Sequence, residues 1–198
     1  MGFIRNVLAL IGLASLIVVG YAIYQFEPYL QQARQLDPGA RAVYTQMAKT
    51  VLETGDSAEA SVYKRRVDPG MTVDQVEEIM AFVANELNIR NVGELPMYQE
   101  VRNLTGEDFP FLKIYQYCDA RIAAQMVTYS DAMAAYLPCR IVLREDEEGA
   151  LWLMTLDLNV MIHGGHPLPA ELRSQAEHVR DSLTMIIDRA ANNDMFGM

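Results

Sequence analysis

The feature that most constrains the fold of this chain is a long uncharged segment near its N-terminus. Residues 6–26 carry no acidic or basic side chain, and residues 7–24 are almost continuously apolar. At 1.5 Å per residue, a helix over this segment reaches across the roughly 30 Å hydrocarbon layer of a bilayer. The sequence therefore predicts a single-pass transmembrane anchor over residues 1–27, which contacts lipid through residues 5–27.

The residues around this segment predict its orientation. Arg5 precedes it and Glu27 follows it, which places the N-terminus in the cytoplasm by the positive-inside rule. At a bacterial inner membrane, the rest of the chain then faces the periplasm. A cleaved signal peptide is the alternative, because Gly20-Tyr21-Ala22 is a passable small-x-small cleavage site. The apolar run is longer than a usual signal-peptide core, which favours the uncleaved anchor.

The charge and the cysteine count exclude several classes of protein. The chain has 26 acidic and 16 basic residues, and its formal net charge is -10. An acidic surface repels phosphate backbones, so no nucleic-acid partner is expected. Two cysteines are too few for a disulfide-built scaffold or a four-thiolate zinc site.

An amphipathic helix is predicted just after the anchor, at 38–54 within a juxtamembrane segment over 28–57. Asp37 and Pro38 are typical of a helix start, and Gly55 of a helix end. Apolar residues recur along the helix at i, i+3 and i+4 spacing. They are Ala40, Val43, Tyr44, Met47, Ala48, Val51 and Leu52.

The apolar stripe of this helix needs something to pack against. One interpretation is that it packs on its own domain. The other, which we favour slightly, is a contact with a second copy or with a membrane-protein complex near the bilayer surface. The predicted partner interface is Val43, Tyr44, Met47 and Val51.

The remaining chain predicts an α+β domain over 58–191, followed by a tail at 192–198 that should fray. A curved antiparallel sheet with two main helices on one face satisfies the order of the elements. Thr72 and Gln75 form a predicted capping box. The predicted strands are 59–67, 95–101, 111–118, 139–144 and 151–158, and the main helices are 72–87 and 169–190.

Three motifs are similar to those of a known family. They are KIYQYCD at 113–119, YLPCRIV at 136–142 and MIHGGHPL at 161–168. Together they resemble the family called domain of unknown function 302 (DUF302), over roughly residues 58–190. The resemblance implies a fold like that of the TATA-box-binding protein and frequent homodimers. It implies no established reaction, so no catalytic residue is carried over and an enzyme is not expected.

The two cysteines each lie at the end of a predicted strand. Cys118 shares strand parity with Ile114, and Cys139 with Ile141, so both thiols should point inward. Buried free thiols, a structural disulfide, and a redox or metal pair are all open interpretations. Tyr115 lies on the other strand face, as does Tyr117. That face is either a ligand or partner surface or the covered side of the sheet.

A metal site is one interpretation of the histidines. Met161, His163, His166 and His178 offer thioether and imidazole donors, which suit copper. The alternative is a turn whose glycines supply positive φ, with solvent-facing histidines. The CxxCH motif of covalent c-type haem attachment is absent from the sequence.

Two functional hypotheses follow. The favoured one is a membrane-anchored, periplasm-facing accessory subunit without catalytic activity and without a cofactor. It would belong to a homo-oligomer or to a larger bacterial membrane assembly, such as one for electron transport. The alternative is a periplasmic metal- or haem-binding protein, or a thiol-redox protein that uses Cys118 and Cys139.

Overall fold

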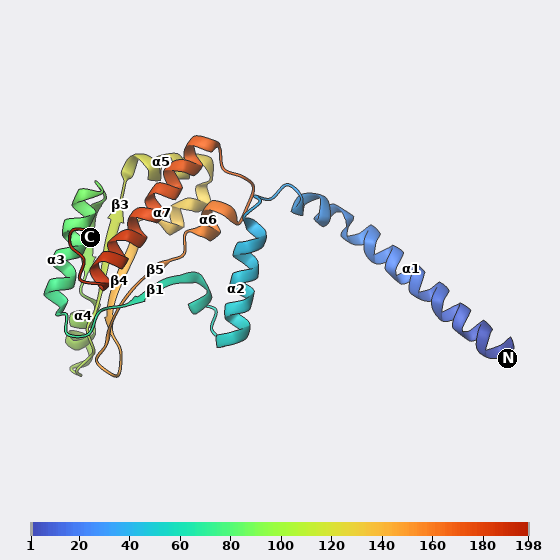
Figure 1. Cartoon of the computed structure of the whole chain (residues 1–198), viewed down its shortest axis with the longest axis horizontal. Helices are drawn as coiled ribbons and strands as arrows, with labels where there is room; N and C mark the ends of the chain where they lie inside the picture. The colour runs from blue at the N-terminus through green and yellow to red at the C-terminus, as the bar shows by residue number, and fades with distance from the viewer. Residues whose placement is uncertain (1, 198) are drawn as a thin grey trace.

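The computed structural model describes residues 2–197, and its architecture is α+β, as predicted. An open five-stranded antiparallel sheet carries helices packed against it, and one long N-terminal helix extends away from this body (Figure 1). The sheet order is β1-β5-β4-β3-β2, so β4 is central. The strands are β1 (Val62–Arg66), β2 (Arg90–Leu95), β3 (Leu112–Cys118), β4 (Cys139–Glu145) and β5 (Leu151–Leu156).

The N-terminal helix, α1 (Gly2–Ala33), is 32 residues long and so spans about 48 Å. Its most apolar 18-residue window has a mean hydropathy of 2.4, and none of that window is buried. Among residues 2–197 it is the one helix long and apolar enough to cross a membrane. The predicted apolar helix is therefore present, and it continues through Pro28 beyond the end of the predicted anchor.

The core lies between one face of the sheet and two long helices, α3 (Val73–Glu86) and α7 (Ala170–Ala191), as predicted (Figure 1). The capping box at the start of α3 is confirmed, because Thr72 and Gln75 each accept a hydrogen bond from the other's backbone N–H. The largest fully buried side chains of the sheet are Tyr117, Ile141, Leu143 and Leu153, and those of α3 and α7 are Val76, Met80, Val83, Leu183, Ile186 and Ile187.

The structure settles which face of β3 is covered. Tyr115 and Tyr117 are 3% and 2% exposed, so they lie on the helix-covered side rather than on a ligand surface. Leu112 and Ile114 alternate with them and are only partly buried. The prediction that the strand face of Ile114 points inward is therefore wrong, although Cys118 at the end of the strand does line an internal pocket. It failed because strand alternation fixes two faces but does not say which one the helices cover.

The predicted strand at 95–101 is also wrong. The strand is β2, which ends at Leu95, and the chain then forms the helix α4 (Met97–Thr105). Pro96 has no N–H for a strand ladder but is tolerated at the start of a helix. Gly106, at φ 73°, ends α4. β2 is an edge strand of the sheet.

Short helices fill the connections. They are the 3-10 helices η1 (Glu59–Ser61) and η2 (Asp131–Tyr136), and the α-helices α5 (Ala120–Tyr129) and α6 (Asn159–His163). The described part of the tail does not fray as predicted. The Arg189 guanidinium donates hydrogen bonds to the carbonyls of Asp194 and Met195. Phe196 lies against Phe82, with ring centroids 5.7 Å apart.

Candidate functional site

The amphipathic helix is α2 (Ala40–Thr54), and the segment before it does not form the predicted cap. The N-cap residue is Gly39, and no side chain caps the helix. Asp37 is instead a buried carboxylate, with a side chain only 1% exposed. This placement was not predicted, because its side-chain partners, His163 and Arg173, are more than 120 residues away in the sequence.

Asp37 is held by groups from three parts of the chain. Its Oδ1 accepts a 2.7 Å hydrogen bond from the Gly39 N–H and lies 3.2 Å from His163 Nδ1. The Arg173 guanidinium, near the start of α7, donates to Oδ2. Burial by itself raises the pKa of this carboxyl, but the Gly39 N–H and the charges of Arg173 and His163 outweigh burial. The pKa is therefore held below its usual value of 3.8, and Asp37 is an anion at neutral pH.

The histidine-glycine loop after α6 completes this contact. The Asp37 N–H donates to the Gly165 carbonyl at 2.9 Å, and the Tyr44 hydroxyl donates to the Gly164 carbonyl at 2.6 Å. A Cβ on Gly164 would overlap the Val160 carbonyl oxygen. Neither glycine has positive φ, so the predicted reason for the pair is wrong. Close approach is what requires glycine at position 164.

We call this set of contacts the clasp: Gln35, Asp37, Gly39, Tyr44, His163–His166 and Arg173. It joins the chain that leaves α1 to the loop between α6 and α7. His166 Nδ1 also lies 3.1 Å from the Gln35 carbonyl. On α7, Arg173 and Glu177 stand at i, i+4, and Glu177 Oε1 lies 3.9 Å from His163 Nε2. This spacing predicts an ion pair within the helix but gives no signal for the contact with Asp37.

The residues of the predicted copper site are divided between different places. His163 and His166 belong to the clasp, and His178 is exposed on α7. Met161 lines a separate pocket. Residues 2–197 contain no group of three or more His, Cys, Asp or Glu side chains that could hold a metal ion.

The predicted partner interface on α2 is partly used within the chain. The helix packs against η1 and α6, and Val43 and Met47 are half-buried. Tyr44 and Val51 remain 48% and 38% exposed, and Leu52 is 87% exposed. The C-terminal part of the stripe thus presents apolar surface.

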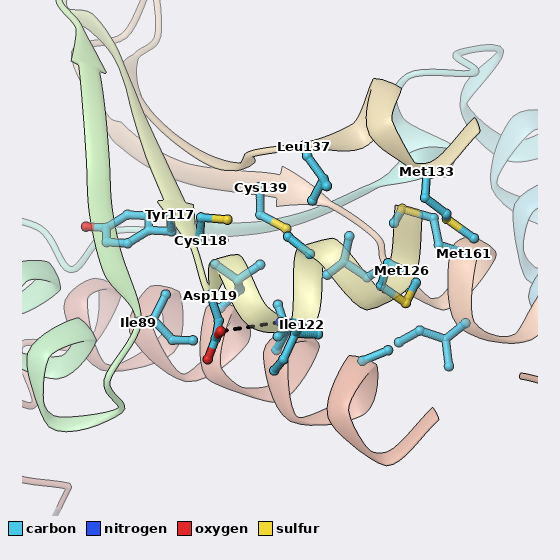
Figure 2. A pocket seen from close by; sticks show the side chains of 16 residues that line it. Ile89, Tyr117, Cys118, Asp119, Ile122, Met126, Met133, Leu137, Cys139 and Met161 are labelled. Atoms are coloured by element: carbon cyan, nitrogen blue, oxygen red, sulfur yellow. Dashed lines mark hydrogen bonds between the residues drawn. The ribbon is translucent and has the colours of Figure 1, made fainter. Parts of the chain in front are cut away.

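A second candidate site is an apolar pocket between α5, η2 and α7 at the ends of β3 and β4 (Figure 2). Its cavity volume is about 40 Å³. Hydrophobic side chains form most of its wall, and the polar exception is Asp119, which caps α5. Five sulfur-bearing side chains line it, namely Cys118, Cys139, Met126, Met133 and Met161.

The two cysteines meet at this pocket as free thiols. Tyr117 pairs with Cys139 across β3 and β4, and Cys118 is the next residue after Tyr117 at the end of β3. Figure 2 shows both side chains turned into the pocket. Burial, with a smaller effect of the Cys118 thiol, raises the pKa of Cys139 to about 11. Burial and the Asp119 carboxylate raise the pKa of Cys118, so both thiols hold their protons at neutral pH.

Comparisons with known proteins agree with this fold. The family described as Domain of unknown function DUF302 matches residues 63–190. A crystal structure of an uncharacterized conserved DUF302 protein from Bacillus stearothermophilus is similar, with a TM-score of 0.52 and 17% identity. The similarity covers 65% of this chain and 97% of that chain. No curated protein matches the chain. The family match includes the pocket but not α1, α2 or Asp37.

Proposed function

The chain belongs to the DUF302 family, and from this premise we propose that it is a membrane-anchored accessory subunit without catalytic activity. In this proposal α1 crosses a bacterial inner membrane with its N-terminus in the cytoplasm. The DUF302 domain faces the periplasm and binds a membrane-protein complex or a second copy. The open sheet with helices on one face is also consistent with the expected likeness to the TATA-box-binding protein.

The observation that carries the proposal is the exposed apolar surface of α1. Large aliphatic and aromatic side chains along this helix are exposed, among them Leu8 at 63%, Leu16 at 71% and Phe26 at 61%. A continuous apolar surface of this size marks a site of contact with membrane or protein. A lipid environment removes that surface from water, and the helix satisfies its own backbone hydrogen bonds there.

The clasp supports the anchoring role, because it restricts the link between the anchor and the domain. The segment between α1 and α2 spans only residues 34–39. Within it, Gln35 and Asp37 contact the loop between α6 and α7. A domain attached in this way stays close to the bilayer surface instead of moving freely on a tether.

The exposed end of α2 supports a binding role. Val51 and Leu52 present apolar side chains one helix away from the anchor. In the proposed arrangement they lie where a neighbouring membrane protein or a second copy could cover them.

Gentle detergent extraction of native membranes followed by native electrophoresis tests the proposal. We expect the full chain to migrate in a defined complex or oligomer, whose components mass spectrometry identifies. A control variant is the full chain carrying Leu104→Glu. This change affects a leucine of α4 that is about as exposed (84%) as Leu52 (87%), and it should leave the complex intact. Migration of the wild-type chain solely as a detergent-bound monomer would contradict the proposal.

A further inference from the structure

The sulfur-lined pocket suggests a ligand that the anchoring role does not require. We propose that this pocket binds one cuprous ion, with the thiolates of Cys118 and Cys139 as its ligands. Both side chains point into the same small cavity (Figure 2). The pairing of Tyr117 with Cys139 holds the end of β3, where Cys118 follows Tyr117, beside the start of β4.

The chemistry of the donors favours Cu(I) over harder ions. Thiolate and thioether sulfur are soft ligands, which select Cu(I), zinc and iron–sulfur clusters. Structural zinc needs four ligands, whereas Cu(I) is stable between two thiolates. The wall adds the thioethers of Met126, Met133 and Met161, so the surroundings of the two thiols are also soft.

The size of the cavity decides between one ion and a larger cofactor. Its volume is about 40 Å³, whereas pockets for organic ligands measure roughly 300–1,000 Å³. The pocket therefore has room for a single ion or a water molecule, but not for a haem. This volume, together with the free thiols, favours copper over haem among the cofactors suggested by the sequence.

Binding is an exchange of a metal ion for protons. Each thiol releases one proton to solvent and forms one S–Cu bond, and copper remains in the +1 state, so no electron is transferred. The resulting complex carries one negative charge. The N-terminus of α5, a ten-residue helix, follows Cys118 directly and favours negative charge nearby, whereas the Asp119 carboxylate that caps this helix opposes it.

A competition titration tests the proposal. The detergent-solubilised full chain is reduced, kept without oxygen, and titrated with Cu(I) against a chromophoric Cu(I) chelator. We expect one ion per chain and a near-ultraviolet thiolate-to-copper absorption band. Removing an outer-shell group already costs about 10–100-fold in metal affinity. Cys118→Ser or Cys139→Ser, which removes a direct ligand, should therefore cost at least about 100-fold.

Two methionine variants test whether copper binds at the pocket or elsewhere on the chain. Met126→Leu alters the pocket wall and should weaken binding less than either serine variant. Met185→Leu changes an exposed methionine of α7 and should leave binding unchanged. Circular dichroism of each variant checks that the fold is kept. The proposal is overturned if the reduced wild-type chain takes up no copper, if uptake survives in the double serine variant, or if the thiols only form a disulfide.

Discussion

The two longest helices of this molecule, α1 and α7, differ in whether their apolar residues are buried within the chain. α1 buries none of its residues. α7 has 22 residues and buries nine of them, including Leu183, Ile186 and Ile187, against the sheet and α3. The apolar face of α7 is therefore covered by the rest of the domain. The apolar surface of α1 needs a membrane or another protein to cover it.

The connection between the two regions is polar, not apolar. Asp37, His163 and Arg173 join the end of the α1 segment to the start of α7. An ion pair that is removed from water is costly unless all its partners are in place. The clasp thus defines one arrangement of linker and domain, which an apolar contact alone would specify less sharply.

The largest effect is expected from a charge placed in the buried face of α7. Ile186 is 0% exposed, so Ile186→Asp buries an unpaired carboxylate and should cost more than about 4 kcal/mol. At roughly 2–4 °C per kcal/mol for a domain of this size, thermal unfolding should shift by about 10 °C or the domain should not fold. The neighbouring change Met185→Asp, at an exposed position, should leave the melting temperature nearly unchanged. Equal shifts for the two variants would show that this face is not the core.

The same substitution in α1 should affect the membrane and not the domain. Leu16→Asp places a charge at the centre of the apolar span and should cost about 3 kcal/mol of insertion free energy. We expect the variant to appear in the soluble fraction while its domain melts at the wild-type temperature. Leu16→Ile is the control and should stay with the membranes. A Leu16→Asp chain that fractionates wholly with membranes would count against a spanning helix.

Several elements that depend on local sequence patterns were predicted correctly. The uncharged run at 6–26 and the capping box at Thr72 are local signals, and both gave the correct element. The strands at 111–118 and 139–144 were found by alternation, because a covered sheet face repeats every second residue. Patterns of this kind act over a few residues, so they locate elements well.

The parts that were missed depend on contacts between distant residues. Asp37 was predicted to cap a helix, because no residue near it in the sequence indicates that His163 and Arg173 contact it. The histidine-glycine loop was interpreted as a metal site or a turn, because its contacts with Gln35 and Asp37 are also distant in the sequence. The parity of Cys118 placed it beside Ile114, yet the residue ends its strand and turns into the pocket with Cys139. The five pocket sulfurs come from separate segments that only the fold brings together.

A smaller effect is expected from breaking the clasp. Asp37→Asn keeps the shape of the side chain but removes the charge that Arg173 and His163 face. Leaving these donors poorly satisfied should cost about 1–3 kcal/mol. Limited proteolysis of the 34–39 segment and thermal unfolding measure the loss. Glu147→Gln, in the exposed β4–β5 turn, is the matched control and should change neither.

The pH dependence of this variant has a fixed sign. The folded pKa of Asp37 lies below its ordinary value of 3.8, so its ionised form stabilises the fold above that value. This contribution disappears as the pH falls through the lowered folded pKa. The stability difference between wild type and Asp37→Asn should therefore be full at neutral pH and shrink in strong acid. A difference that grows on acidification would show that the charge of Asp37 does not stabilise the clasp.

The smallest effect on stability is expected at the open end of α2. Val51 and Leu52 are exposed, so changing both to Glu should alter the unfolding free energy by no more than about 0.5 kcal/mol per site. Native electrophoresis of the full chain should nevertheless show loss of the complex or oligomer. Assembly that survives the double change would assign this stripe no role in partner binding.

Alkaline extraction of native membranes, combined with an intact mass of the extracted chain, shows whether α1 spans the bilayer. High pH releases peripheral proteins but leaves spanning helices in the bilayer. We expect the wild-type chain to stay in the membrane pellet with a mass that includes α1. Release into the supernatant, or a mass that lacks the residues up to Ala22, would contradict this expectation and identify the N-terminal helix as a peripheral contact or a removed signal sequence.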